Sequence, residues 1–425
     1  MPRRTIAHPV WLEQAMTSMS SPRAMWLVIL TGAAFLMVTM GMRQSMGLFV
    51  SPINTATGLG IASISFAMAV SQFIWGAMQP IAGAFADRYG TGRVLAVGIV
   101  LLAIGTAVTP LMTTTAGLIF AIGLLSAGGS GAGSFSVLIA AAAQRLPAER
   151  RGFASGVINA GGSFGQFVFA PLAQRLIAGL GWMGALWSMA VITLVALPLA
   201  RTLRRPAVAP AAKAAAAANE GGLRGALRSS MADRSYLLLH AGFFTCGFHI
   251  AFLVTHLPGE VSLCGLPASV ASWSLAIIGL SNICGSLMAG YWVQRYRSKL
   301  ILAWMYASRA VLILVYLMAP KTELTFYLFA IGLGFTWLAT VPPTAAVVGK
   351  LFGTRYLATL FGLTLLSHQI GAFFGAWLGG IVVTQQGNYL WMWYADAMLA
   401  AAAALVNLPI KEAPMAAALQ PRPAE

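Results

Sequence analysis

The segment GAFADRYGTGR, Gly83–Arg93, joins two apolar stretches of the chain, residues 62–86 and 93–112. Each stretch has about the 20 mostly apolar residues that a helix needs to cross a lipid bilayer. A related segment, GYWVQRYRSKL, starts at Gly290 and again separates two apolar stretches. We therefore expect two copies of one membrane-spanning unit.

Apolar stretches of this length recur along the 425 residues, of which 59% are hydrophobic and only 8% charged. A soluble protein carries about a quarter of its residues as charges, and lipid admits only helices or closed barrels. Because the stretches are continuous rather than alternating, we predict an all-α polytopic membrane protein with twelve transmembrane helices. The predicted helices are 25–51, 62–86, 93–112, 115–143, 152–177, 182–201, 236–261, 269–293, 300–319, 324–349, 356–383 and 389–409.

Three stretches of the first half recur in the second half at a nearly constant spacing. The matches are Gly41 and Arg43 with Gly247 and His249 at an offset of 206, Gly83 with Gly290 at 207, and Gly161 and Gly165 with Gly371 and Gly375 at 210. Many transporters are built from such repeats, with a site between the two halves. We predict two pseudo-symmetric six-helix bundles, a linker and two terminal segments. Their bounds are 25–201 and 236–409 for the bundles, 202–235 for the linker, and 1–24 and 410–425 for the terminal segments.

The basic residues gather on one side of the predicted helices. The formal net charge is +16, yet only Arg175 and Lys321 fall on the other side, while Arg43 and Arg309 lie within helices. This is the positive-inside bias, so we expect both termini and the linker in the cytoplasm and no nucleic-acid partner. The high Ala and Gly content without an organelle-type presequence favours a bacterial inner membrane.

The segment at Gly83 resembles the loop between helices 2 and 3 of the major facilitator superfamily, whose pattern is G-x3-D-[RK]-x-G-[RK]-[RK]. The matching residues are Gly83, Asp87, Arg88, Gly90 and Arg93, whereas Thr91 and Gly92 stand at basic positions. The resemblance implies a gating role, in which Asp87 pairs with neighbouring basic groups in one state and releases them in another. The alternative is a static ion pair at a helix end.

Three further stretches resemble the monocarboxylate-transporter and oxalate:formate-antiporter branch of that superfamily. They are GMRQSMGLFVSP from Gly41, CGFHIAFLVTHLP from Cys246 and SHQIGAFFGAWLGG from Ser367. The resemblance implies a secondary active transporter of small organic anions, driven by protons or by anion exchange. Members of this branch hold the substrate carboxylate with an Arg in helix 8. Here that helix carries Asn282 and no charge, so either Asn282 replaces the anchor or the anchor lies elsewhere.

Ionisable side chains are costly inside the bilayer and usually face a cavity or a partner. Arg43 and His249 occupy equivalent repeat positions in the first helix of each half. In the fold that the resemblance implies, these helices line a central cavity, so we expect the two side chains to face each other across it. A guanidinium can bind a carboxylate through two parallel hydrogen bonds, which makes Arg43 the predicted main substrate contact, with Gln44 beside it. His249 is predicted to bind substrate, to carry a proton or to be structural. The other predicted substrate-binding residues are Asn159, Gln166, Asn282, His368 and Gln369.

Arg309 and Asp396 lie at similar depths in predicted helices 9 and 12, which are both peripheral in this fold. We predict a structural ion pair between them.

Two other functions were weighed against the anion carrier. A drug or cation efflux antiporter would need an acid in the cavity, and the deep acid Asp396 lies on a peripheral helix. An enzyme would need a metal cluster or a nucleophile–base pair, and no nucleotide-binding loop is present either. We therefore expect a monomeric carrier, not an enzyme, without cofactor or metal, that moves a small organic anion, with or without protons, by alternating access.

Overall fold

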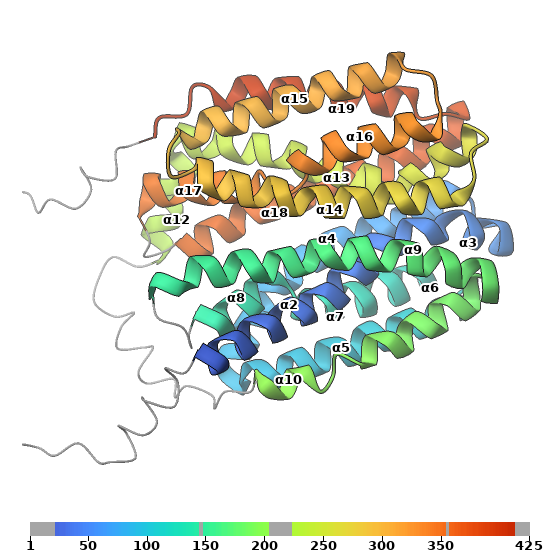
Figure 1. The fold of residues 1–425 in the computed structure, drawn as a ribbon, viewed down its shortest axis with the longest axis horizontal. Coiled ribbons are helices and arrows are strands. Elements are labelled where there is room, and N and C mark those ends of the chain that lie inside the picture. Colours follow the sequence, from blue (N-terminus) through green and yellow to red (C-terminus); the bar gives the residue numbers. More distant parts are fainter. Residues whose placement is uncertain (1–21, 144–147, 204–222, 354–356, 413–425) are drawn as a thin grey trace, which may run out of the picture.

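The computed structural model describes residues 22–143, 148–203, 223–353 and 357–412, which form two packed bundles of long helices (Figure 1). The helices of the first bundle are α2 (Pro22–Ser45), η1 (Met46–Phe49), α3 (Val50–Thr57), α4 (Ile61–Tyr89), α5 (Thr91–Val108), η2 (Thr109–Leu111), α6 (Thr115–Leu118), η3 (Ile119–Ser126), α7 (Ala127–Ala132), α8 (Phe135–Ala143), α9 (Ala148–Leu194) and α10 (Leu199–Thr202). Those of the second are α12 (Leu223–Ala232), α13 (Arg234–Leu263), α14 (Ala268–Trp292), α15 (Ser298–Met318), α16 (Glu323–Thr336), α17 (Val341–Phe352), α18 (Leu357–Gln386) and α19 (Leu390–Asn407).

Eleven segments of the described chain are long and apolar enough to cross a membrane, and one of them contains two spans. This segment, Gly156–Thr202, is 47 residues long and turns at Gly181, where φ is 70° and ψ is 170°. A side chain strongly disfavours that backbone conformation, so glycine suits the turn. The all-α fold with twelve predicted spans is therefore confirmed.

Two of the predicted helices are broken at corresponding places. The stretch 115–143 is interrupted at Gly133 and Ser134, between α7 and α8, and the stretch 324–349 at Trp337–Thr340, between α16 and α17. At the offset of 206 that relates the halves, Gly133 corresponds to Ala339. A break leaves backbone carbonyls without helical partners. In the first bundle Thr39 Oγ1 donates to the Gly133 carbonyl at 3.3 Å.

Glycines set the close approach of the helices inside each bundle. A Cβ atom on Gly165 would lie 2.1 Å from the Met37 carbonyl oxygen, which brings α9 against α2. Likewise, a Cβ atom on Gly375 would lie 2.1 Å from the Phe248 carbonyl oxygen, which brings α18 against α13. Small residues at such contacts are typical of helix packing in membranes.

The two bundles meet mainly through α4 on α18 and α9 on α14. We call the end of the molecule at which α2 begins and α19 ends the terminal side, and the opposite end the far side. At the far side the bundles are tightly packed, because a Cβ atom on Gly47 would lie 1.8 Å from the Val254 carbonyl oxygen. There too, a Cβ atom on Gly380 would lie 2.4 Å from Ser65 Cβ.

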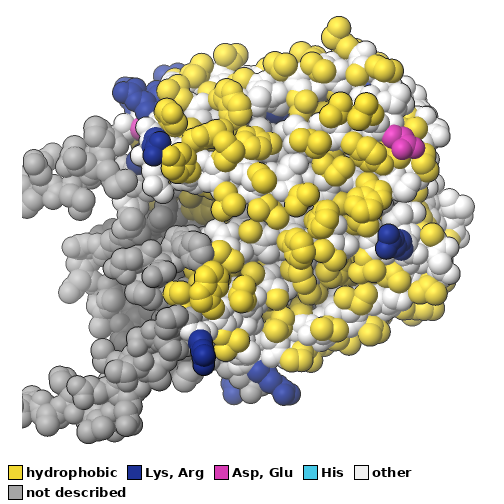
Figure 2. All heavy atoms as spheres, viewed as in Figure 1, with side chains coloured by type: hydrophobic (Ala, Val, Ile, Leu, Met, Phe, Trp, Pro, Cys, Tyr) yellow, Lys and Arg dark blue, Asp and Glu magenta, His cyan; other side chains and the backbone are white. Residues whose placement is uncertain are grey.

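The outer surface suits lipid. Large apolar side chains such as Val191, Val195, Val311 and Leu405 are exposed on the predicted spans. Figure 2 shows hydrophobic side chains over most of one face, with Lys and Arg mainly at its terminal side. The chain is thus a multi-pass membrane protein.

A candidate substrate cavity between the two bundles

A cavity of about 890 Å³ lies between the bundles, lined by residues of both. Its polar lining consists of Arg43, Gln44, Gln72, Gln79, Asn159, Ser163, Gln166, His368 and Gln369. Aromatic rings of Trp75, Phe135, Phe243 and Phe361 form much of the remaining wall. Among the described lining residues Arg43 carries the one permanent charge, and none is Asp or Glu. The cavity is therefore apolar with one fixed cation and several amides.

Arg43 stands in the last turn of α2. A Cβ atom on Gly41 would lie 2.9 Å from the Gly165 carbonyl oxygen, so α2 lies directly against α9 and the position of Arg43 is fixed. The guanidinium Cζ lies 4.2 Å from the centre of the Trp75 ring, an attractive cation–π distance. Its Nη2 donates to Gln72 Oε1, and its Nε is buried without a partner among the described residues.

The amides around Arg43 keep unused hydrogen-bonding capacity. Gln44 Nε2 donates to Gln166 Oε1 at 3.5 Å, which leaves Gln44 Oε1 and Gln166 Nε2 without a described partner. Gln369 Nε2 and His368 Nδ1 are 3.1 Å apart, and Gln369 Oε1 and His368 Nε2 have no described hydrogen-bond partner. Buried polar atoms nearly always find a partner. A bound polar molecule or water would supply it.

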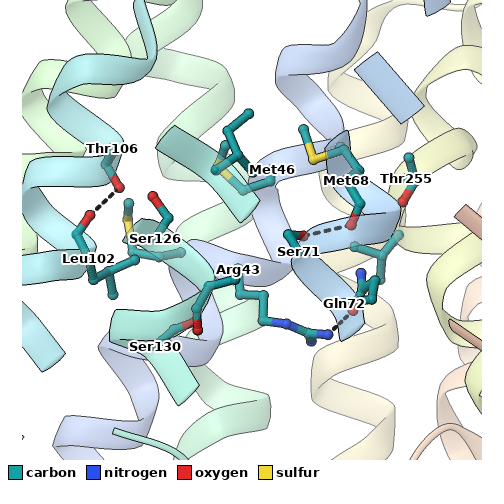
Figure 3. A pocket seen from close by; sticks show the side chains of 15 residues that line it. Arg43, Met46, Met68, Ser71, Gln72, Leu102, Thr106, Ser126, Ser130 and Thr255 are labelled. Carbon is teal, nitrogen blue, oxygen red and sulfur yellow. Dashed lines mark hydrogen bonds between the residues drawn. The ribbon is translucent and has the colours of Figure 1, made fainter. Parts of the chain in front are cut away.

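A second cavity of about 490 Å³ shares Arg43 and Gln72 with the first (Figure 3). It lies toward the far side, between α2, α4, α5, η3 and α7, and the hydroxyl groups of Ser71, Thr106, Ser126, Ser130 and Thr255 contribute to its wall. In Figure 3 the Arg43 side chain points to Gln72. The Arg43–Gln72 pair therefore separates the central cavity from this second one.

His249 does not line the described cavities, in contrast to the expectation that it faces Arg43. Its neighbour Ile250 lines the central cavity instead. The His249 ring points into the second bundle, where Nδ1 lies 2.5 Å from Asp396 Oδ2, and both side chains are fully buried. Sequence depth places a residue along the membrane normal, but helix rotation decides which way it points.

The predicted ion pair between Arg309 and Asp396 is corrected by the structure, since among the described residues no direct bridge joins them. Asp396 pairs with His249. Arg309 Nη2 donates to the Thr336 carbonyl at 2.7 Å and to the Trp337 carbonyl at 3.3 Å. These carbonyls are free because helix α16 ends at the break, and a cation is favourable at a helix C-terminus.

Asn282 joins three elements rather than lining the described cavities. Its Nδ2 donates to Ser163 Oγ on α9 at 2.8 Å. Its Oδ1 accepts from the Leu338 backbone N–H, in the break, at 2.9 Å. This side chain therefore links the two bundles just behind the wall that Ser163 and Leu338 form.

The predicted gating segment connects α4 to α5. Gly90 has φ 91° there, and its N–H donates to the Ala86 carbonyl at 2.9 Å. Gly83 has open space at its Cβ position, and Arg93 is exposed. The side chains of Asp87 and Arg88 lie outside the described part of the chain, so the gating role stays a prediction.

The sequence reasoning missed Gln72, Trp75 and Gln79 on α4. Their spacing of three and four residues places them on one face of a helix. Two amides on one face of an otherwise apolar span are a sequence signal for these residues, weaker than the signal of an ionisable side chain.

Comparison with known proteins agrees with this architecture. A family model described as Major Facilitator Superfamily matches residues 27–364 and, in an overlapping second match, residues 262–424. The chain is 26% identical to monocarboxylate transporter 13 of Rattus norvegicus over 396 residues, covering 90% of this chain and 89% of that one. It is 22% identical to the oxalate:formate antiporter of Oxalobacter formigenes over 370 residues, covering 85% and 86%.

Among solved structures, the D-xylose–proton symporter superposes with a TM-score of 0.71 at 15% identity, covering 92% of this chain and 97% of that one. At this identity the likeness concerns the fold. With a family match over almost the whole chain, twelve spans and a cavity between two bundles, the protein belongs to the Major Facilitator Superfamily of transporters.

Proposed function

We propose that the protein is a secondary active transporter of small organic anions, with monocarboxylates as the substrate class. The observation that carries this proposal is Arg43, the one permanent charge among the described residues that line the central cavity. The printed names of two relatives, a monocarboxylate transporter and an oxalate:formate antiporter, support the same class.

In this proposal a carboxylate replaces Gln72 as the partner of the Arg43 guanidinium. Two parallel N–H···O bonds then form, while the Trp75 ring holds the cation from its face. Unused amide atoms of Gln44 and Gln369 accept or donate the remaining hydrogen bonds. The aromatic wall receives the organic part of the anion.

The position of the cavity supports a mechanism of alternating access. From the level of Arg43 its lining extends toward the terminal side, to Asn159 on α9 and Phe361 on α18. The far side is closed at Gly47 and Gly380. With the terminal side in the cytoplasm, as the positive-inside bias favours, this is an inward-facing state. The cavity is lined within one chain, which suits a monomer, and we keep a bacterial inner membrane as the proposed location.

A drug or cation efflux antiporter is the second candidate. The aromatic wall of the cavity favours it, since rings contact apolar drugs and cations well. The charge of the cavity opposes a cationic substrate, because Arg43 would repel it.

Thermal unfolding of the purified protein with ligands tests the proposal, since a ligand that binds the folded state raises its melting temperature. The panel contains monocarboxylates, dicarboxylates, amines and lipophilic cations, and each is tested on wild type, Arg43→Ala and Arg43→Lys. Arg201→Ala, at an exposed position outside the predicted sites, is the control.

We expect stabilisation by a monocarboxylate that Arg43→Ala abolishes and Arg43→Lys weakens, because an ammonium lacks the planar fork. Arg201→Ala should respond like wild type. Stabilisation by cations alone, or by carboxylates regardless of Arg43, would contradict the proposal.

A further inference from the structure

We propose that His249, Asp396 and Arg309 form a proton-binding site that couples proton movement to anion transport. We call these three residues the buried charge cluster. The inference rests on the proposed anion transport and adds the coupling ion and the place where it binds.

The buried charge cluster brings together three helices of the second bundle, α13, α19 and α15. All three side chains are fully buried. His249 Nδ1 and Asp396 Oδ2 are 2.5 Å apart, and Arg309 is anchored by the carbonyls of Thr336 and Trp337. The Trp337 ring stands edge-on to the His249 ring, with centres 5.8 Å apart. Ionisable groups at such depth are costly and mark ion pathways in many transporters.

Two atoms of the buried charge cluster can accept a proton. Asp396 Oδ1 and His249 Nε2 are buried and have no hydrogen-bond partner among the described residues. With neutral imidazole, the charges of Arg309 and Asp396 cancel. A proton on either atom then makes the cluster singly positive, which is unfavourable in a dry interior unless a negative charge lies nearby.

The other carboxylate on these three helices among the described residues is Glu260, which lies about 16 Å along α13 from His249 and accepts from the Tyr316 hydroxyl of α15 at 2.9 Å. Helix α15 contributes Arg309 and Tyr306, whose ring centre lies 5.5 Å from Arg309 Cζ. Helix α13 contributes Cys246, whose Sγ lies 3.3 Å from Thr340 Oγ1 of the break. From α18 comes His368, on which the charges of both Arg309 and Arg43 act. Around Asp396 the other titratable and charged groups are thus Cys, Tyr, His and Arg, while the Glu260 carboxylate lies about three helical turns away along α13.

The missing negative charge is the substrate. Ile250 and Leu338 line the central cavity, and each is the chain neighbour of a residue beside or in the cluster, His249 and Trp337. The cluster therefore lies one layer behind the cavity wall. A bound anion at Arg43 adds one negative charge, and a proton on the buried charge cluster adds one positive charge. With both bound, the net charge within the membrane equals that of the empty carrier. Each ligand then favours binding of the other, which is the thermodynamic requirement for coupling.

Transport by proteoliposomes separates this inference from the proposed function. Labelled formate, acetate and lactate serve as probes in two assays, exchange across the membrane without a pH gradient and accumulation driven by a pH gradient. The variants are His249→Gln and Asp396→Asn. The matched control is His256→Gln, a buried imidazole on the same helix whose Nε2 lies 2.7 Å from the Ala376 carbonyl oxygen and which pairs with no described carboxylate.

We expect His249→Gln and Asp396→Asn to keep exchange near the wild-type rate and to lose about tenfold or more of the pH-driven accumulation. The control should keep both activities. Unchanged accumulation in the two variants, or an equal loss in the control, would overturn the proton site and leave anion transport standing. If wild type moves none of the probes in either assay, the proposed function itself fails, and this inference with it.

A measurement on wild type keeps the inference testable if the variants do not fold. Formate remains an anion above pH 5, so its own titration does not interfere. Its affinity, measured by thermal stabilisation, should rise about tenfold between pH 8 and pH 5.5. An affinity that does not change over this range would overturn the proposal.

Discussion

At the scale of single residues, two arginines buried in one membrane protein have different tasks because their surroundings differ. Arg43 lies against an aromatic ring and a single amide, with a buried Nε that has no described partner. Arg43 can therefore donate further hydrogen bonds to a ligand. Arg309 is fully buried and donates to two carbonyls at the end of α16. Its role is structural and electrostatic.

Replacing Arg309 with Met should therefore destabilise the protein by about 3–5 kcal/mol. The carbonyls at the end of α16 would lose their donor, and Asp396 would lose the permanent cation of the cluster. Thermal unfolding in one detergent measures the change, with Arg201→Met at an exposed position as control. Adding Asp396→Asn should recover part of the loss. A loss no larger than that of the control would contradict this assignment.

At the scale of helices, glycine contacts and helix breaks determine how the spans fit together. Gly165 and Gly375 occupy matching positions in the repeat, and each approaches a backbone carbonyl on the first helix of its own bundle, that of Met37 on α2 and that of Phe248 on α13. The breaks near Gly133 and Trp337–Thr340 also match, but different side chains satisfy them, Thr39 in one bundle and Arg309 in the other. The two halves thus share their packing and differ in their chemistry.

The packing can be tested with Gly165→Ala. The new Cβ atom would lie 2.1 Å from the Met37 carbonyl oxygen, which is backbone and cannot move without shifting α2. We expect a loss of about 1–3 kcal/mol in thermal unfolding experiments. Gly290→Ala, whose Cβ atom would meet nothing within 4 Å, should be neutral. Equal effects of the two substitutions would mean that the close approach of α9 and α2 is not structurally required.

The link between the bundles can be tested by substitution of Asn282. Asn282→Ala removes buried hydrogen bonds to Ser163 Oγ and to the Leu338 N–H, and should cost about 1–3 kcal/mol of stability. Ser286→Ala, which removes only the 3.3 Å contact to Asn282 Oδ1, is the control. Because the lost bond to Ser163 joins the two bundles, transport rates should change in Asn282→Ala and stay near wild type in the control. A stability loss with unchanged transport would assign Asn282 to packing alone.

At the scale of the whole molecule, the structure is closed at the far side, and its central cavity extends toward the terminal side. The closure depends on direct contact between α13 and the end of the first span, where Gly47 meets the Val254 carbonyl. The second cavity lies behind this contact, with Thr255 in its wall. Opening the far side by rocking the bundles would join the second cavity to the outside.

A bulky side chain at position 47 should prevent that closure. We expect Gly47→Leu to lose transport and to expose the second cavity to the far side. In a variant without the native cysteines and with Thr255→Cys, a membrane-impermeant maleimide applied at the far side should label faster by about tenfold or more when Gly47→Leu is present. Gly290→Leu, at an open position, is the control. Unchanged labelling would show that this contact does not close the far side.

The sequence by itself determined the number and length of the spans, the duplication, the family and the presence of Arg43 at a central cavity. The family follows from the resemblance carried by the segment Gly83–Arg93. The other features follow from hydropathy and spacing, because the bilayer imposes a length on every helix and the repeat imposes equivalent positions. Among the predicted substrate contacts, Gln44, Asn159, Gln166, His368 and Gln369 also line the cavity. Their contact with substrate remains a prediction.

Only the tertiary structure decided which partners the buried groups have. The depths of Arg309 and Asp396 in the membrane, estimated from the sequence, predicted an ion pair between them. In the structure the orientation of α13 about its axis directs the His249 side chain to Asp396 instead. The break after α16 gives Arg309 its carbonyls, and it also brings the Leu338 N–H to Asn282. Depth along the membrane follows from counting residues at 1.5 Å each. Rotation about a helix axis and the site of a break depend on packing against neighbouring helices, which are distant in the sequence.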